Sequence, residues 1–416
     1  MKVLINGAGI GGLTMALSLD AVGIECGLFE RSRSIRELGV GINILPHAVR
    51  ELAELGLLDA LDRVGNRTLE LIYANRFGQE IWREPRGIEA GYNYPQFSIH
   101  RGRLQRILYD AARVRIGDDR IHAAHQLQDF AQDNRGVTAT FLRRDDSSAE
   151  TVTARGDALI AADGINSAVR RACYPDEGPP VWNGVMMWRG AVEYTPFLTG
   201  RSMIVAGGLG SRLVLYPISS ETTIRGANLL NWIVDARVGD GTEPPPRRED
   251  WNRPGRRDEV LPHVERIFRF SAIDPAEVIR STEEFYEYPM CDRDPIPHWS
   301  FGRVTLLGDA AHPMHPNGSN GASQAILDAR ALASLLAEAD DVVTALKAYE
   351  TARLPATAKV VQANRSGGPE RVIDVIEGRA PNGFVNIEDV APRAELEAIV
   401  KGYARTAGFD QTHVNR

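Results

Sequence analysis

Three short stretches rich in glycine and small polar residues could each bring the backbone close to a phosphate or a flat ring. They are residues 7–12 (GAGIGG), 163–170 (DGINSAVR) and 308–321 (GDAAHPMHPNGSNG). Each follows an apolar run of the kind that forms a buried strand, at residues 3–5, 158–162 and 304–307. The ordered set predicts a dinucleotide site of the FAD type.

The first stretch has the spacing G-x-G-x-x-G. Gly7 permits a tight turn, Gly9 lets the backbone approach a pyrophosphate, and Gly12 allows a helix over residues 13–21 to pack closely on the strand. A second strand, residues 24–29, ends at Glu30, whose carboxylate suits the two hydroxyls of an adenosine ribose and would repel a 2′-phosphate. The pattern favours FAD or NAD over NADP; the alternative is a glycine-rich turn without a ligand.

The third stretch carries the most chemistry. Asp309 could accept hydrogen bonds from a ribityl chain, and Pro316, Gly318 and Gly321 would keep the following loop flat. A helix is predicted from about residue 321, and the positive end of its dipole would stabilise charge on a reduced flavin by roughly 0.3–2 kcal/mol. The alternative is an ordinary strand–turn–helix.

Composition limits the classes of protein. The chain has 416 residues, 43% of them hydrophobic, which is enough for a large core and two domains. A formal charge of −7 argues against nucleic acid or an anionic membrane as partner. The three cysteines form no CxxC, no apolar run reaches the length of a membrane span, and the chain starts directly on the nucleotide strand. We therefore expect a cytoplasmic protein, either monomer or homodimer.

The predicted fold class is α/β: a Rossmann-like, three-layer FAD/NAD(P)-binding domain interrupted by an antiparallel-sheet substrate domain, plus C-terminal helices. Helices are predicted at 47–61, 101–113 and 393–405, and strands of the inserted sheet at 185–188, 203–206, 213–216 and 229–233. The predicted FAD-binding domain comprises 1–75, 99–180 and 286–365. The substrate domain comprises 76–98 and 181–285, and 366–416 form a helical extension.

The order GxGxxG, DGxxSxVR and GDAAHPMxPxGxxG resembles the single-component (class A) FAD-dependent aromatic hydroxylases, which share the p-hydroxybenzoate hydroxylase fold. The resemblance covers residues 1 to about 360. Further segments resemble one branch more closely, that of the phenazine hydroxylase of pyocyanin biosynthesis. They are GVGINI (39–44), EPRGIEAGYNYPQFSIHRGRLQRIL (84–108), MWRG (187–190), YPIS (216–219), YPMCDRDPIPHW (288–299) and NGASQAILDA (320–329).

Cofactor residues follow from the resemblance position by position. Gly7, Gly9, Gly12 and Glu30 match the adenosine-diphosphate site. Arg101 rather than Arg103 matches the arginine that reaches the FAD, Asp163 and Gly164 match the second fingerprint, and Gly308 and Asp309 match the ribityl fingerprint. The remaining predicted contacts are Arg31, Leu127, Pro316, Gly318, Asn320, Gly321 and Ala322. Ser319 and Ser323 depart from the Gly and Asn of many relatives, which puts the donors of this loop in doubt.

The resemblance also implies a reaction. NADH or NADPH would reduce bound FAD, O₂ would give a C4a-hydroperoxyflavin, and one oxygen atom would pass to a small aromatic or heteroaromatic substrate. A second GxGxxG is absent, so the nicotinamide would dock transiently. Two alternatives stay open: an FAD-dependent reductase or an N-oxidising or Baeyer–Villiger enzyme of the same fold, and a non-redox FAD-binding module. A halogenase is disfavoured because no WxWxIP-like segment occurs.

Substrate contacts are predicted on the inserted sheet and the flavin loop: Trp188, Leu213, Tyr216, Trp232, Tyr288 and Met314, each with ordinary core packing as the alternative. His315 and Tyr216 are the candidate catalytic residues, with His47 a more distant one. Arg189 could pair with a substrate carboxylate or, alternatively, with a neighbouring acid. The HxxH pairs 122/125 and 312/315 lack further ligands at metal-binding spacing. The arginine-rich segment 247–257 is predicted to be a solvated loop.

Overall fold

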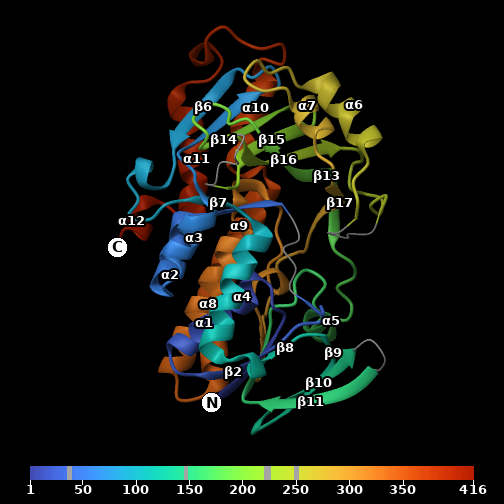
Figure 1. Ribbon diagram of the computed structural model, residues 1–416, viewed down its shortest axis with the longest axis vertical. Coiled ribbons are helices and arrows are strands. Elements are labelled where there is room, and N and C mark those ends of the chain that lie inside the picture. Colours follow the sequence, from blue (N-terminus) through green and yellow to red (C-terminus); the bar gives the residue numbers. More distant parts are fainter. Residues whose placement is uncertain (35–39, 145–148, 220–225, 248–252) are drawn as a thin grey trace.

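The computed structural model describes residues 1–34, 40–144, 149–219, 226–247 and 253–416. Its lower half in Figure 1 is built on a six-stranded sheet in the order β18-β19-β12-β1-β2-β8. The strands are β1 (Lys2–Asn6), β2 (Glu25–Phe29), β8 (Ile121–His122), β12 (Ala158–Ala161), β18 (Ser300–Phe301) and β19 (Val304–Leu306). All pair in parallel except β18 at the edge. Val3, Leu4 and Ile5 are fully buried, which explains why these strands are continuous apolar runs.

Long helices cover this sheet and a small antiparallel sheet extends it. The helices are α1 (Ile10–Ala21), α4 (Arg101–Ile116), α8 (Gly321–Glu338) and α9 (Val342–Arg365), with the short α5 (Ala168–Cys173) after β12. Helix α1 packs against both α4 and α8, and α9 packs against α8. The small sheet holds β9 (His125–Asp133), β10 (Gly136–Arg144) and β11 (Ala149–Gly156). This half is the predicted Rossmann-like domain.

The upper half in Figure 1 is a seven-stranded sheet in the order β17-β13-β16-β15-β14-β5-β6. Its strands are β5 (Glu70–Asn75), β6 (Glu80–Pro85), β13 (Val181–Tyr194), β14 (Ser202–Gly208), β15 (Ser211–Pro217), β16 (Asn228–Arg237) and β17 (Phe285–Asp292). Helices α6 (Arg257–Ile267) and α7 (Pro275–Arg280) pack on one face, and α10 (Arg371–Arg379) packs on the opposite face over β5 and β14. The end of that second face formed by β13 and β17 therefore remains for contact with the lower half.

Two predicted boundaries differ from the structure. The sequence predicts residues 70–75 and 286–292 to belong to the FAD-binding domain, but they form β5 and β17 of the seven-stranded sheet. The sheet is also mixed, because β5 pairs with β14 in parallel. Strand alternation alone does not tell which sheet a strand joins when the chain crosses between two layers.

A three-stranded sheet connects the halves, and one predicted helix is divided. The connecting sheet consists of β3 (Gly41–Ile44), β4 (Asn66–Arg67) and β7 (Phe97–His100). The helix predicted over 47–61 is two helices, α2 (Pro46–Glu54) and α3 (Leu58–Val64), separated at Gly56, whose φ of +75° ends α2 in the left-handed region.

The C-terminal segment packs within the same chain. Helix α11 (Arg393–Thr406) confirms the helix predicted at 393–405, and α12 (Gln411–Val414) follows it. Leu396 and Val400 of α11 join the core formed by α10 and the seven-stranded sheet, while Tyr403 packs with Leu45 near β3. Within the described ranges, no helix is long and apolar enough to cross a membrane.

Candidate functional site

The three glycine-rich turns meet at one edge of the parallel sheet. Asn6 of β1 is in register with Ala161 of β12, and Ala161 is in register with Leu306 of β19. Each turn begins within two residues of these positions, so all three leave the carboxyl ends of adjacent strands. That edge is where open α/β sheets bind their ligands.

The first turn is shaped by contacts that only glycine permits. A Cβ on Gly12 would lie 1.9 Å from the carbonyl oxygen of Gly7, so the start of α1 can approach β1 only without a side chain. A Cβ on Gly9, the N-cap of α1, would meet nothing within 4 Å. The backbone at Gly9 therefore faces open space, as a pyrophosphate-binding turn requires.

Because Gly9 faces open space and Gly12 is closely packed, substitutions at the two positions distinguish an effect on FAD binding from an effect on folding. Gly9→Ala is expected to fold normally, because φ at this position is −73°, but to lose roughly tenfold or more in FAD affinity since the methyl group occupies the pyrophosphate approach. Gly12→Ala is expected to lose both stability and FAD. The ratio of bound flavin to protein and the thermal midpoint of the flavin-free protein measure the two effects. Equal FAD retention in Gly9→Ala and the native protein would refute the assignment.

Glu30 lies at the end of β2 beside the first turn. Its Oε2 accepts a hydrogen bond from the Ala8 amide at 2.8 Å and its Oε1 accepts one from the Ser32 amide at 2.8 Å. Each carboxylate oxygen has a second lone pair, so Glu30 can still bind ribose hydroxyls. Arg31 is exposed next to it, whereas Leu127 on β9 is buried in the core of the lower half.

Asp163 in the second turn is partly committed to the protein. Its Oδ2 accepts hydrogen bonds from Asn6 Nδ2 at 2.9 Å and from the Ala168 amide at 2.8 Å. Its Oδ1 is buried without a hydrogen-bond partner among the residues that the structure describes, and burial raises the pKa of this carboxyl. A Cβ on the adjacent Gly164 would again meet open space. A buried acceptor beside open space fits a ligand that donates hydrogen bonds.

Arg101 and Asp309 are exposed and interact through their charges at the same edge. Both side chains keep solvent-accessible surface, yet desolvation by the surrounding protein lowers the pKa of Arg101 and raises the pKa of Asp309. The two charges attract one another, and the charge of Arg189 further lowers the pKa of Arg101. Two accessible side chains of opposite charge at this edge suit a ligand that carries both anionic and hydroxyl groups.

A buried ion cluster of Asp328, His312 and Arg353 supports the third turn. Asp328 of α8 accepts hydrogen bonds from the Gly308 amide at 3.2 Å, His312 Nε2 at 2.5 Å and Arg353 Nε at 2.7 Å. Burial alone would raise the pKa of Asp328, but the charges and hydrogen bonds of His312 and Arg353 outweigh burial and lower it. The carboxylate therefore stays ionised and fixes the turn that carries Asp309.

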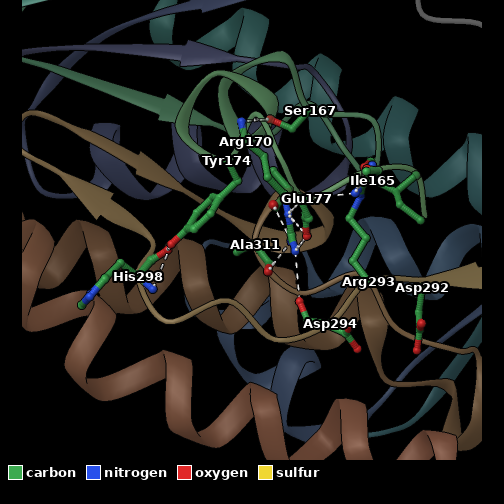
Figure 2. Close-up of polar contacts among 12 residues, drawn as sticks. Ile165, Ser167, Arg170, Tyr174, Glu177, Asp292, Arg293, Asp294, His298 and Ala311 are labelled. Carbon is green, nitrogen blue, oxygen red and sulfur yellow. Dashed lines mark hydrogen bonds and ion pairs between the residues drawn. The ribbon is translucent and has the colours of Figure 1, made fainter. Parts of the chain in front are cut away.

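Arg170 joins the second turn to the third, as Figure 2 shows. Its guanidinium is 1% exposed and donates to the carbonyl oxygens of Ala310 at 3.1 Å and Ala311 at 2.8 Å. It also pairs with Glu177, which in turn pairs with Arg293. Sequence reasoning did not single out Arg170, although it is the last residue of the DGINSAVR stretch and could have been examined there.

The flavin loop, residues 316–322, is supported by the C-terminal half of the chain. The Gly318 amide donates to Glu370 at 2.9 Å, and Tyr403 Oη donates to the Asn317 carbonyl at 3.2 Å and to Asn364 Oδ1 at 2.8 Å. Asn320 is buried, and its Nδ2 has no acceptor in the described part of the chain. The loop begins at Pro316 and leads into α8, which starts at Gly321 and Ala322.

Both serine departures make contacts to β3 or to the residue that follows it. Ser319 has a φ of +54°, a conformation that glycine adopts more readily, and its Oγ accepts from Asn43 Nδ2 at 3.4 Å. Ser323 Oγ accepts from the Leu45 amide at 3.2 Å. The serines thus tie the loop to the strand that faces it.

The two candidate catalytic side chains lie in different surroundings. His315 Nε2 lies 3.4 Å from Asp292 Oδ2, and Asp292 pairs with Arg365, so the imidazole faces this ion pair. Burial, with the charge of Arg365, lowers the pKa of His315 although Asp292 opposes the shift. Tyr216 is 2% exposed, and burial raises its pKa to about 12, so it keeps its proton and can donate a hydrogen bond. His47 is also buried, and burial lowers its pKa to about 3.

The predicted substrate residues divide between the two faces of the seven-stranded sheet. Trp188, Leu213 and Trp232 pack in the core under α6 and α7, away from the cleft, which corrects their prediction as pocket residues. Tyr216 and Tyr288 lie on the opposite face, with Arg189. Successive side chains of a strand point to opposite faces of the sheet, and the sequence does not reveal which set of side chains faces the flavin domain.

Other predicted features also change. Met314, predicted as a substrate contact from the flavin loop, is half-buried and packs with Leu45 and Tyr403. Arg247 pairs with Glu259 and with the fully buried Glu287, and Arg253 also pairs with Glu287, so these two arginines anchor their segment to β17. Arg247 is half-buried and so departs from the prediction of a solvated loop, whereas Arg253, Arg256 and Arg257 are exposed; Arg248 lies outside the described residues. No group of three or more metal-binding side chains gathers in the ranges that the structure covers.

The geometry fits FAD: open space at Gly9 and Gly164, an unsatisfied acceptor on Asp163, and charged cleft residues Arg101 and Asp309 lie along one edge. The FAD binding domain family matches residues 1–184 and 242–364.

Relatives with stated activities match nearly the whole chain. The phenazine 1,6-dicarboxylic acid hydroxylase of Lysobacter antibioticus is 41% identical over 414 residues, 99% of this chain and 98% of the relative. The 3-hydroxybenzoate 6-hydroxylase 1 of Aquipseudomonas alcaligenes is 32% identical over 365 residues, covering 86% of each chain.

Solved structures share the fold. HpxO of Klebsiella pneumoniae, solved with FAD and uric acid, superposes with a TM-score of 0.75 at 25% identity over 98% of this chain and 96% of HpxO. The 2,6-dihydroxypyridine-3-hydroxylase of Arthrobacter nicotinovorans has a TM-score of 0.71 at 21% identity, over 88% of this chain and 91% of its own. With the motifs, the cleft and these matches in agreement, the chain belongs to the family of FAD-dependent aromatic monooxygenases.

Proposed function

We propose that this monooxygenase hydroxylates a planar, fused-ring heteroaromatic compound of the phenazine type, with NADH or NADPH as reductant. The observation that carries the proposal is the extent of the 41% identity, which spans 99% of the chain. It therefore includes residues 185–241, which the FAD binding domain match leaves out. These residues form most of the sheet above the cleft, and a match that extends over them bears on substrate as well as on cofactor.

The residues of the three turns would hold FAD. The adenosine diphosphate of FAD would be bound by Gly7, Gly9, Gly12 and Glu30. The part of FAD that connects the adenosine diphosphate to the flavin ring would be bound by Arg101, Asp163 and Asp309. When bound, FAD supplies the redox and oxygen chemistry. The protein would orient the ring, exclude water and position the substrate.

The seven-stranded sheet, now including β5 and β17, would form the substrate domain. Tyr216 and Tyr288 face the cleft, and their hydroxyls could orient a ring heteroatom or a phenolic oxygen. Because Tyr216 is protonated at neutral pH, we assign it hydrogen-bond donation in place of acid–base catalysis. His315 would position the loop through Asp292.

The test follows the flavin spectrum under anaerobic conditions. NADH or NADPH is mixed with the holoenzyme and a phenazine, a hydroxybenzoate, uric acid or no aromatic. The proposal expects the phenazine to accelerate bleaching of the flavin most, and mass spectrometry after adding isotopically labelled O₂ to find one labelled oxygen atom on a ring carbon. Label on a ring nitrogen would indicate N-oxidation. NAD(P)H oxidation without labelled product, with every aromatic tested, would overturn the proposal.

A further inference from the structure

A cavity of about 640 Å³ lies beside β4, the edge strand of the connecting sheet. Its wall also includes residues of the segment between β13 and β14, of the short helix η1 (Gly87–Ala90) and of the start of β16. None of the wall residues that the structure describes belongs to the three glycine-rich turns. Small-molecule sites in proteins measure about 300–1,000 Å³. This β4 cavity is therefore large enough for a fused-ring compound and is separate from the candidate flavin site.

Two buried asparagines on the wall of the β4 cavity have acceptor oxygens without a partner. Asn66 is 5% exposed, and its Nδ2 donates to the carbonyl oxygens of Gly200 and Ser219, each at 3.2 Å. These two bonds fix the orientation of the amide, and its Oδ1 is left with no donor among the described residues. Asn228 is 8% exposed, and its Oδ1 likewise has no described donor. Because buried acceptors are nearly always paired, the two oxygens fit a bound molecule that donates hydrogen bonds.

The charged side chains on the described wall pair with one another. Arg67 donates two hydrogen bonds to Asp62, at 2.6 Å each, and Arg201 pairs with Glu89 at 3.0 Å. Each guanidinium of the wall thus already has a carboxylate, and the charges of the four side chains cancel. An uncharged molecule therefore suits the β4 cavity better than an anion.

The remaining wall suits a flat ring. Pro95 and Pro196 supply rigid apolar surfaces, and Ile88 adds an exposed aliphatic side chain. Gly65 and Gly200 contribute no side chain, so the wall beside them is backbone. Small-molecule pockets are commonly apolar, with a few polar groups that fix the orientation of the ligand. The two asparagine oxygens are placed to be such groups.

A second cavity, of about 410 Å³ beside α8, differs in this respect. Its wall includes Arg330, which pairs with Glu51, and Arg353, which pairs with Asp328. No buried side-chain atom of its described wall lacks a hydrogen-bond partner. Unpartnered oxygens therefore distinguish the β4 cavity from this other hollow of similar size.

We propose that the β4 cavity is a second ligand site, which binds an uncharged, planar heteroaromatic molecule whose hydroxyl or N–H group donates to Asn66 and Asn228. A hydroxylated phenazine has this chemistry, and it is the kind of product that the proposed reaction would release. In this choice of ligand the inference rests on the proposed function. The cavity itself is defined by its own residues.

The test separates the two sites by their effect on the flavin. Isothermal titration calorimetry of the oxidised holoenzyme measures all binding of 1-hydroxyphenazine, whereas the flavin absorbance reports the molecule beside the flavin. A further binding event that leaves the flavin spectrum unchanged is expected. 1-Methoxyphenazine has the same ring without the donor, and it is expected to bind at this second site about tenfold more weakly or less.

Variants of the cavity wall assign the second event to the asparagine oxygens. Asn228→Leu removes an acceptor at similar volume and is expected to weaken the flavin-silent event about tenfold or more, with the flavin-perturbing event unchanged. Asn228→Asp keeps an acceptor oxygen and is expected to stay within about threefold of the native protein. Asn134→Leu is the matched control, because Asn134 is exposed in the turn between β9 and β10 and is not part of the cavity wall. Thermal midpoints are recorded for each variant.

Three results would overturn the inference: no flavin-silent binding by the native protein, equal affinity of that site for the hydroxy and methoxy compounds, or an unchanged second event in Asn228→Leu. The first would leave water as the occupant of the cavity. All three leave the proposed function intact, because it is decided by labelled oxygen on the ring. A flavin-silent event that persists while no phenazine is hydroxylated overturns the proposed function alone. Should Asn228→Leu not fold, the two ligands with the native protein still decide the matter.

Discussion

Replacing Arg170 by methionine is expected to lower the free energy of unfolding by about 3–5 kcal/mol and to release FAD. Methionine fills much of the volume of the arginine side chain. It leaves the carbonyl oxygens of Ala310 and Ala311 without the hydrogen bonds that Arg170 donates. Glu177 then keeps Arg293 as its remaining ion-pair partner. The carbonyls belong to the turn that carries Asp309. Loss of the guanidinium therefore removes stability and the alignment of the ribityl-binding turn together.

Arg171→Met is the control for this variant. Arg171 is adjacent in α5 but exposed, so its replacement is expected to change stability and FAD affinity little. Urea unfolding of the flavin-free proteins and fluorescence titration with FAD measure the two quantities. Indistinguishable results for the two variants would show that Arg170 does not couple the second turn to the third.

The Asp328→Asn variant is expected to lose about 3 kcal/mol at neutral pH, because a neutral amide cannot offset the charge of Arg353 and presents a donor to His312 or Arg353. The loss should depend on pH. Asp328 has a folded-state pKa below the ordinary value of 3.8, so its carboxylate stabilises the fold fully above that value. The contribution disappears as pH falls through the lower, folded-state pKa.

Urea unfolding of native and variant protein at several pH values between about 7 and 3 tests the sign. The difference in free energy is expected to be largest near neutrality and to shrink as the solution becomes acidic. Asp110→Asn serves as control, since Asp110 forms an exposed pair with Arg106 at 2.8 Å on α4 and should change stability little at any pH. A difference that is independent of pH would show that the charge of Asp328 is not what stabilises the turn.

Much of the cofactor half could be predicted from the sequence because its chemistry is carried by backbone. Gly7, Gly9 and Gly12 act through the absence of a side chain, and Asp163 and Asp309 follow strands whose continuous burial is visible as apolar runs. Parallel strands bring the turns that follow them to one edge, so the motifs imply the geometry. The class of protein followed from the same residues.

The substrate half was predicted less well because the role of each residue depends on which face of the sheet its side chain occupies. Trp188 and Arg189 are adjacent, yet one enters the core under α6 and the other reaches β3. Arg247 and Glu287 are forty residues apart, and their ion pair is invisible in a Pro-rich, charged segment that has the composition of a loop. Such contacts depend on packing between distant segments rather than on local pattern.

The order of strands in the parallel sheet has a consequence for biosynthesis. β1 lies in the middle of the sheet, but its neighbour β12 ends at residue 161 and the next strand, β19, is made only at residues 304–306. The loop beside the flavin further depends on Glu370 and Tyr403. The nascent chain thus carries its first glycine-rich turn long before β19 and the residues that support the loop beside the flavin have been made. Complete cofactor binding requires all of these segments to have been synthesised, and until β19 has formed, the edge of β12 with which it pairs stays exposed and can be bound by chaperones.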